Sequence, residues 1–126
     1  MAKQVLQATS APEPLGPYSV ATEANGFVFV SGQVGINPET GSAPEGGVEP
    51  QTRQAMTNLR AILSDNGLTM DDIVKTTLFL ASMADFPNVN TIYSEYFGGQ
   101  PPARSTIQAG ALPGGYLFEI EAIAAR

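Results

Sequence analysis

The sequence predicts an α+β fold in which two helices pack on one face of a mixed β-sheet. Strand-like and helical segments follow one another along the chain, only two segments have a helical period, and Gly- and Pro-rich turns separate them. The 126 residues suffice for a single domain, residues 1–126, that hides roughly two-thirds of the surface of its unfolded chain. We find no repeat and no change of composition that would divide the chain.

The first part of the chain is predicted to form strands. Val5-Leu6 begins a short strand. Residues 19–23 and 27–33 flank Asn25-Gly26, a dipeptide that suits the positive φ angles of a tight hairpin turn. Residues 37–47 are rich in Gly, Pro, Asn and Ser, so we expect a surface loop there.

Both predicted helices lie further along the chain. From Pro50 the apolar residues follow a helical period, and Gly67 is a natural C-terminal stop. The apolar stripe of this helix consists of Ala55, Met56, Leu59, Ile62 and Leu63. Asp85 is the predicted N-cap of the second helix, which has Pro87 in its first turn and ends at Gly98-Gly99. Its apolar positions are Phe86, Val89, Tyr93, Tyr96 and Phe97.

Three more strands complete the predicted sheet, at residues 73–80, 103–109 and 117–125. The last two are joined through the turn at Leu112-Pro113-Gly114-Gly115. Side chains alternate between the faces of a strand. On the last strand this alternation gives two sets, Phe118, Ile120 and Ala122 on one face and Glu119, Glu121 and Ile123 on the other.

One face of the sheet has no helix to cover it, yet residues 27–30 and 78–80 are apolar on both faces of their strands. An exposed apolar face promotes aggregation, so we predict that it packs against other copies of the chain. If the first set on the last strand faces the helices, Glu119 and Glu121 lie at this interface. Buried acids need partners, and Arg104 is the candidate.

Charge and residue usage exclude several classes of function. The net charge is −6 and Lys and Arg do not cluster, so nucleic acid is a poor partner. The chain has no Cys and no His, which removes thiol nucleophiles, imidazole bases and the usual metal ligands, and we expect no metal. No apolar run suits a signal peptide or a membrane span, so we expect a cytoplasmic protein without a membrane partner.

Arg104 is the best candidate for a functional residue. It is one of only six Lys and Arg residues, and it lies in a Pro-rich, strand-forming segment, Pro101-Pro102-Ala103-Arg104-Ser105. A guanidinium on a rigid strand can bind a small carboxylate through two parallel hydrogen bonds. From these residues alone, a structural Arg–Glu pair is an equally good interpretation.

Several sequence blocks occur in the order typical of one family. They are Gly16-Pro17-Tyr18-Ser19, Val30-Ser31-Gly32-Gln33, Gln51-Thr52 with Asn58-Leu59, Asp85-Phe86 with Asn90 and Tyr93, Pro102-Ala103-Arg104-Ser105, and Glu119-Ile120-Glu121-Ala122-Ile123-Ala124. From about Val5 to Arg126 the chain resembles the RidA/YjgF family of imine deaminases. The resemblance implies a chorismate-mutase-like α+β fold, a homotrimer whose sheets line a central β-barrel, and an active site in each cleft between neighbouring subunits.

The resemblance also implies a reaction. Family members hydrolyse reactive enamines and imines such as 2-aminoacrylate, 2-iminopropanoate and 2-iminobutanoate to 2-oxo acids and ammonia, without a cofactor. Arg104 would bind the substrate carboxylate, and Glu119 would orient and activate a water against the imine carbon. A carboxyl group near an apolar interface can have the raised pKa that this proton transfer requires.

The resemblance assigns five further residues to substrate binding, namely Tyr18, Ser31, Gly32, Asn90 and Thr106. On residue type alone, Tyr18 equally fits a turn anchor, Gly32 a β-bulge and Asn90 a structural bridge. Thr106 stands where many family members have cysteine, so only its main-chain groups would contact substrate and no thiol chemistry is expected.

An alternative is a non-catalytic protein that binds small carboxylates or has a regulatory or chaperone-like role, because one fold can host several functions. A module that only binds a carboxylate needs Arg104 and has no use for Glu119, so the presence of both favours catalysis. Family members have also been described as ribonucleases and translation inhibitors. An acidic chain without histidine lacks the usual groups for cleaving RNA.

Overall fold

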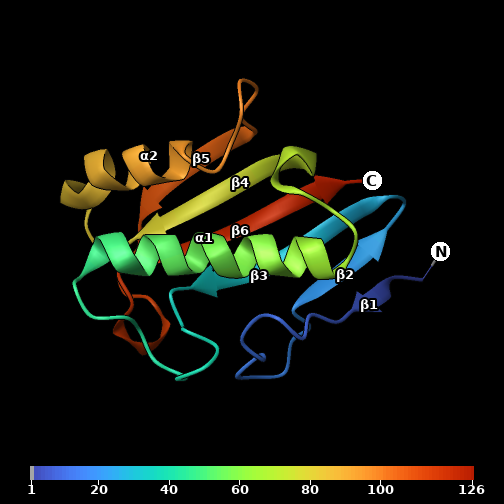
Figure 1. Ribbon diagram of the computed structural model, residues 1–126, viewed down its shortest axis with the longest axis horizontal. Helices are drawn as coiled ribbons and strands as arrows, with labels where there is room; N and C mark the ends of the chain where they lie inside the picture. The colour runs from blue at the N-terminus through green and yellow to red at the C-terminus, as the bar shows by residue number, and fades with distance from the viewer. Residues whose placement is uncertain (1) are drawn as a thin grey trace.

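The strands of this protein form one mixed sheet, shown by a computed structural model that describes residues 2–126 (Figure 1). In chain order the elements are β1 (Gln4–Leu6), β2 (Ala21–Ala24), β3 (Phe27–Val34), α1 (Val48–Asp65), η1 (Met70–Asp72), β4 (Ile73–Leu80), η2 (Met83–Asp85), α2 (Phe86–Ser94), β5 (Ala103–Gln108), η3 (Pro113–Gly115) and β6 (Phe118–Ala125). The sheet order is β1-β2-β3-β6-β4-β5. β4 and β5 are parallel, and the other neighbours are antiparallel.

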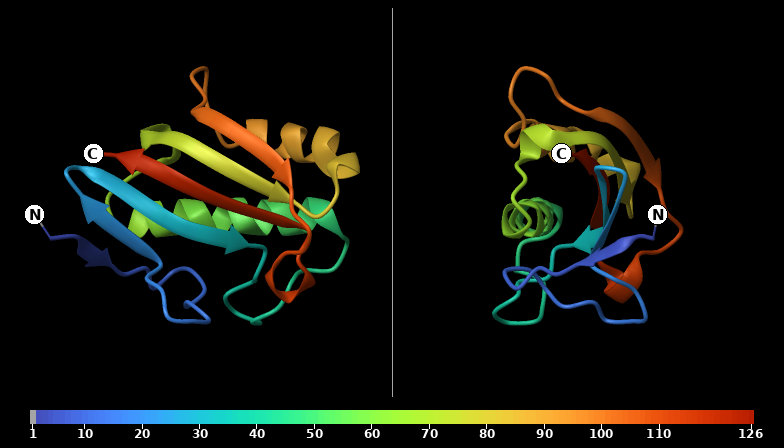
Figure 2. Two further views of the ribbon diagram at one scale, coloured as in Figure 1. Left: turned by 180° about the vertical axis from the view of Figure 1, so that it is seen from behind. Right: turned by 90° about the vertical axis from the view of Figure 1, so that its right-hand side faces the viewer.

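Both α-helices pack on the same face of the sheet, as predicted (Figures 1 and 2). The apolar stripe of α1 is completely buried, and it lies over β3 and β6. The strand residues that point toward the helices belong to the core, among them Val28, Leu78, Phe118 and Ile120. The hydrophobic core of the described residues therefore lies between the sheet and the helices.

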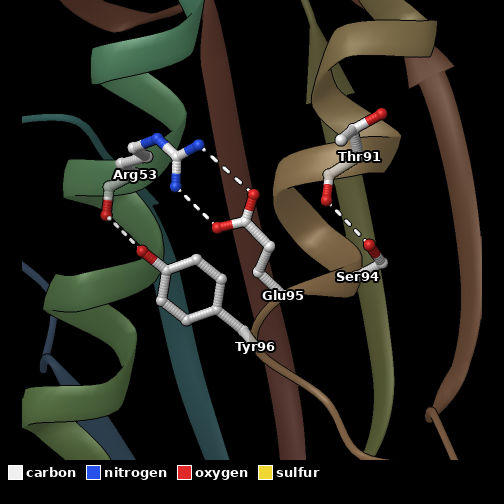
Figure 3. Close-up of polar contacts among 5 residues, drawn as sticks. All are labelled: Arg53, Thr91, Ser94, Glu95 and Tyr96. Atoms are coloured by element: carbon white, nitrogen blue, oxygen red, sulfur yellow. Dashed lines mark hydrogen bonds and ion pairs between the residues drawn. The ribbon is translucent and has the colours of Figure 1, made fainter.

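Polar contacts tie the two helices together (Figure 3). Arg53 of α1 donates from Nη1 to Glu95 Oε1 at 2.7 Å and from Nη2 to Glu95 Oε2 at 3.3 Å. The hydroxyl of Tyr96 donates to the carbonyl oxygen of Arg53 at 3.3 Å. Within α2, Ser94 Oγ donates to the carbonyl oxygen of Thr91 at 2.7 Å. These bonds fix the C-terminal end of α2 against α1.

The turn chemistry of the first half is confirmed. Asn25 and Gly26 have φ angles of 53° and 81°, as their hairpin turn requires. β2 begins at Ala21 instead of residue 19, because Ser19 and Val20 bond to the Ser31 side chain and backbone in place of a regular ladder. α1 begins at Val48, before Pro50, which therefore lies inside the first turn.

The predicted start of the second helix is confirmed, because α2 has Asp85 as its N-cap residue and Pro87 in its first turn, but the predicted end is wrong. α2 ends at Ser94, before Tyr96 and Phe97, although both still pack partly against the core. The Asp85 side chain makes no capping hydrogen bond, because η2 runs directly into α2 and gives Asp85 helical angles (φ −82°, ψ −6°). Ser82 Oγ instead accepts from the Ala84 amide at 3.2 Å and caps η2.

The opposite face of the sheet carries no helix in the described residues, and we refer to it as the open face (Figure 2, left). Phe27 and Phe29 of β3 are 45% and 44% exposed on it. The predicted alternation of β6 is confirmed, because Phe118 and Ile120 are fully buried toward the helices. Glu119 and Glu121 therefore point toward the open face.

Strand β3 has an irregularity that shapes the region of the site. Its register with β6 shifts between Val30 and Gln33, so Ser31 and Gly32 form a bulge within the strand. Beyond the strand, a Cβ at Gly35 would lie 2.5 Å from the carbonyl oxygen of Gln51. Only glycine allows α1 to approach the chain this closely.

None of the helices between residues 2 and 126 has the length and apolar character needed to cross a lipid bilayer.

Candidate functional site

A cavity of about 570 Å³ lies beside the C-terminal half of β3 and the start of β6. Four predicted site residues line it, Tyr18, Ser31, Gly32 and Glu119. Two further acids, Glu13 and Glu121, line the same cavity, which we refer to as the acid cavity. Its remaining walls come mainly from residues 12–20 and from the 3-10 turn η3.

The carboxylate of Glu119 lies directly against the bulge in β3. A Cβ at position 32 would overlap Glu119 Oε2, so glycine leaves room for the carboxylate in this position and a larger residue would displace it. The bulge interpretation of Gly32 is therefore correct, and the close approach that glycine permits is to a side chain of the same cavity. Binding of substrate at Gly32 stays a prediction.

Burial raises the pKa of Glu119 above its usual range, because the partly buried charge loses hydration. The neighbouring carboxylate of Glu121 raises the pKa further through like-charge repulsion. In the described residues neither acid forms a salt bridge. Glu119 therefore holds its proton more tightly than an ordinary glutamate does, as is common for carboxyl groups at functional sites.

Tyr18 and Ser31 hold the segment before β2 in place. Tyr18 is 52% exposed, and its hydroxyl accepts a long hydrogen bond of 3.4 Å from the Leu15 amide, so it does anchor a turn. Ser31 Oγ donates to the carbonyl oxygen of Ser19 at 2.6 Å. Both residues also line the acid cavity, where contact with substrate stays a prediction.

Arg104 lies in a different place, which we refer to as the arginine site. On β5 it sits beside Thr76 of β4, a fully buried residue that faces the helices. Arg104 Nη1 donates to Asn90 Oδ1 at 2.8 Å. The guanidinium also lies over two rings of α2, with Cζ 4.9 Å from the centroid of Tyr93 and 5.5 Å from that of Phe86. Asn90 thus bridges α2 and β5, and contact of Asn90 with substrate stays a prediction.

Thr106 belongs to the arginine site as well. It follows Arg104 by two residues on β5, so both side chains point toward the same face. Its hydroxyl oxygen is shielded from solvent and has no hydrogen-bond partner among residues 2–126. A buried hydroxyl without a partner is costly, so this position favours an additional polar contact.

One chain does not bring the two predicted catalytic residues together, and within the described residues Arg104 forms no salt bridge with the acids of β6. Pairing across an interface between copies stays a prediction. β4 lies between β5 and β6. Across the sheet, Arg104 aligns with Thr76 and then with Ala122, which face the helices. Glu119 points to the open face, so the backbone of the sheet separates the two groups.

Other residues around the two sites were not predicted as functional. Glu13 and Tyr116 line the acid cavity from loops that carry no local sequence signal. Gln33 of β3 also lines it, and its family block was recognised without a role for this residue. Phe86 and Tyr93 have a clear signal, the apolar stripe of α2. That stripe predicted that both residues pack in the core, and it did not predict their contact with Arg104.

The fold and the two sites define a small α+β protein whose single sheet carries an acid cavity on its open side and an arginine site on its helical side. The family profile described as Endoribonuclease L-PSP matches residues 8–126. A RutC family protein of Pyrococcus abyssi is 44% identical, with 98% of both chains covered. Mouse 2-iminobutanoate/2-iminopropanoate deaminase is 46% identical over 97% of this chain and 90% of the mouse protein. This chain belongs to the YjgF/RidA/RutC family.

Solved structures agree with this membership. A Rid family protein of Yersinia pestis is 48% identical and superposes with a TM-score of 0.95, covering 99% of this chain and all of that one (100%). E. coli TdcF with bound serine is 36% identical and superposes with a TM-score of 0.92 over 98% of both chains. The α+β fold with one sheet and two helices is thus the fold of the family.

Proposed function

We propose that this protein hydrolyses small 2-imino acids, and the enamines in equilibrium with them, to 2-oxo acids and ammonia. The observation that carries the proposal is the pair of chemically complementary sites, one arginine without a carboxylate partner and one partly buried glutamate with a raised pKa. The substrates would be 2-aminoacrylate, 2-iminopropanoate and 2-iminobutanoate. The mouse relative carries the name of such a deaminase, which supports this choice.

The reaction needs few groups. Arg104 binds the substrate carboxylate, and the Glu119 carboxylate takes a proton from a water molecule as its oxygen attacks the imine carbon. The C=N electron pair moves to nitrogen, which takes up a proton from solvent. Glu119 then returns the proton of the attacking water to the nitrogen, the C–N bond breaks, and the hydroxyl of the intermediate loses its proton to solvent to leave a 2-oxo acid and ammonia. Imines hydrolyse readily, so positioning and one acid–base group suffice.

The site is proposed to form between neighbouring copies in a homotrimer. Arg104 and Glu119 lie on opposite faces of one sheet, so a second copy has to supply the group that the first cannot reach. The exposed phenylalanines of the open face support such an assembly, since apolar side chains of this size are normally buried. In this arrangement the open faces of the copies would line a central barrel.

The proposal is tested with imines made in the assay by a threonine dehydratase acting on serine or threonine. The protein should accelerate release of the 2-oxo acid above the spontaneous rate. Arg104→Ala should abolish the acceleration, and Glu119→Ala should slow it while pyruvate still binds. Arg60→Ala is the matched control, because Arg60 also lies over a tyrosine ring, that of Tyr96, away from both sites. Full activity in either site variant would reject these roles.

A further inference from the structure

We propose that Tyr93, with Phe86, is a positioning residue that holds the Arg104 guanidinium in the orientation needed to bind a substrate carboxylate through two hydrogen bonds. This inference rests on the proposed function, because it describes how the arginine of that site is held. The ligand class is a planar carboxylate next to a C=N or C=O group, as in a 2-imino or 2-oxo acid.

Two aromatic rings contact the guanidinium. Arg104 Cζ is 4.9 Å from the ring centroid of Tyr93 and 5.5 Å from that of Phe86. Both distances lie within the range of about 6 Å in which a cation is attracted to the face of a ring. The two residues are seven positions apart on α2, two turns of helix, so they present their rings on the same side.

The Tyr93 ring is itself fixed. Its hydroxyl shares a hydrogen bond of 2.7 Å with Thr76 Oγ1, a fully buried side chain that lies beside Arg104 in the ladder of β4 and β5. Its ring packs against Phe97 at a centroid distance of 4.7 Å. A ring held at its hydroxyl and against a neighbouring tilted ring can hold the guanidinium that lies over it.

The remaining contact leaves most donors of Arg104 free. A guanidinium has five N–H donors in one plane. Asn90 accepts one of them from Nη1, and among residues 2–126 the guanidinium donates no other hydrogen bond and pairs with no carboxylate. The two rings and Asn90 therefore fix the plane of the Arg104 guanidinium, and parallel N–H groups stay available as donors. Two carboxylate oxygens require this geometry.

The test compares three variants of the full protein, Tyr93→Leu, Tyr93→Phe and Tyr96→Leu. Two quantities are measured, the kinetics with 2-iminopropanoate and the Kd of pyruvate by calorimetry. Tyr93→Leu removes the ring and should raise both the KM and the pyruvate Kd about tenfold, with kcat changed less than about twofold. Tyr93→Phe keeps the ring and loses only the hydroxyl, so it should restore both values to within about threefold of the original protein.

Tyr96→Leu is the matched control. Tyr96 follows α2, and its ring lies under a different arginine, with Arg60 Cζ 5.2 Å from its centroid. This variant loosens the same region without touching Arg104, so its KM and Kd should stay unchanged.

Arg104→Ala should abolish pyruvate binding, which would show that pyruvate binds at this arginine. If Tyr93→Leu does not fold, Phe86→Leu replaces it and should raise the Kd at least about threefold.

The outcomes separate this inference from the proposed function. Tyr93→Leu or Phe86→Leu with an unchanged Kd and KM overturns the positioning role, even if the protein is a good deaminase. Pyruvate binding that weakens in Tyr93→Leu supports the positioning role, even if the original protein hydrolyses no imine. An equal loss in Tyr96→Leu would show a general effect of α2 and would also overturn it. A protein that neither binds pyruvate nor hydrolyses the imine overturns both.

Discussion

Glu119 is placed where its charge is unfavourable. Partial burial and the neighbouring Glu121 both raise its pKa, and the glycine at position 32 gives its carboxylate room against β3. Between the usual glutamate pKa and the raised one, the folded state binds this proton more tightly than the unfolded state does. The stability of the fold should therefore fall as pH rises through that interval.

Glu119→Gln should consequently make the protein more stable and less active. The variant lacks the charge, so its melting temperature at pH 7 should exceed that of the original protein, and the difference should vanish below about pH 4, near the unperturbed glutamate pKa. Its kcat should fall about a hundredfold, the usual loss when a general base is removed. Thermal melts across pH and the coupled assay measure the two effects.

Glu121→Gln tests the cause of the raised pKa. This variant removes the like charge and keeps Glu119, so the pKa of Glu119 should move down toward its usual range. Since the proposed base is the carboxylate, the pH at which activity reaches half its maximum should move to a lower value. An unchanged pH profile would contradict the coupling of the two acids.

Gly32→Ala should displace the Glu119 carboxylate. A methyl group at position 32 would overlap Glu119 Oε2, so either the side chain or the bulge has to move. We expect a loss of about 1–3 kcal/mol in the free energy of unfolding, together with lower kcat. Gly99→Ala is the control, because nothing lies within 4 Å of the added methyl group there. Similar effects in urea unfolding for the two variants would contradict the close fit at Gly32.

At the scale of elements, α1 holds the chain that leaves β3 and forms part of the acid cavity. Asn58 is 1% exposed. Its side-chain amide donates to the carbonyl oxygens of Val34 at 3.3 Å and Ile36 at 2.8 Å, and both of these residues line the cavity. A buried amide with two backbone partners thus links the core helix to the wall of the site.

Asn58→Asp should break this link. The variant replaces the amide donors with a carboxylate that faces two carbonyl oxygens in a buried position, so we expect a loss of about 3 kcal/mol or more in the free energy of unfolding at pH 7. Thr57→Asp adds the same charge at the exposed neighbouring position and should have little effect. Urea unfolding of both variants is the measurement, and equal free energies would rule out the link.

Helices and turns were predictable where a few neighbouring residues determine them. Asn25-Gly26 fixed the hairpin turn, and the stripe from Ala55 to Leu63 identified α1, because periodicity and turn preference act over a few residues. The N-cap position of α2 at Asp85 was predictable, but the absence of a capping hydrogen bond from its side chain was not. A 3-10 turn capped by Ser82 precedes the helix, and the choice between two overlapping caps depends on packing.

At the scale of the whole molecule, the order of strands decides where the site residues lie. The sequence predicted the strands and the face of Glu119, but the insertion of β4 between β5 and β6 depends on pairing between distant segments. Arg104 was therefore a candidate from its own segment, and the other site residues were predicted from the resemblance. The separation of these residues into two sites was not predicted. That separation follows from Arg104 aligning with Thr76 in a parallel ladder.

Mixing two inactive variants tests whether a site draws on two copies. Arg104→Ala chains keep Glu119, and Glu119→Gln chains keep Arg104, so some clefts in a mixed assembly contain both groups. Random mixing in equal amounts should restore about a quarter of the original activity, because each of the two positions in a cleft is intact in half of the cases. The two chains are refolded together, and the activity is compared with the sum of the separate variants. Activity no greater than that sum would mean that no cleft uses two chains.

The placement of Arg104 and Glu119 on opposite sides of one sheet has a kinetic consequence. In the proposed arrangement each cleft needs Arg104 from one chain and Glu119 from another. A single folded chain therefore has no complete active site. Turnover per chain would then depend on dilution, staying constant while the copies remain associated and falling steeply once they separate. At such dilution the reaction rate would rise with more than the first power of protein concentration, because the active site forms only when copies of the chain associate.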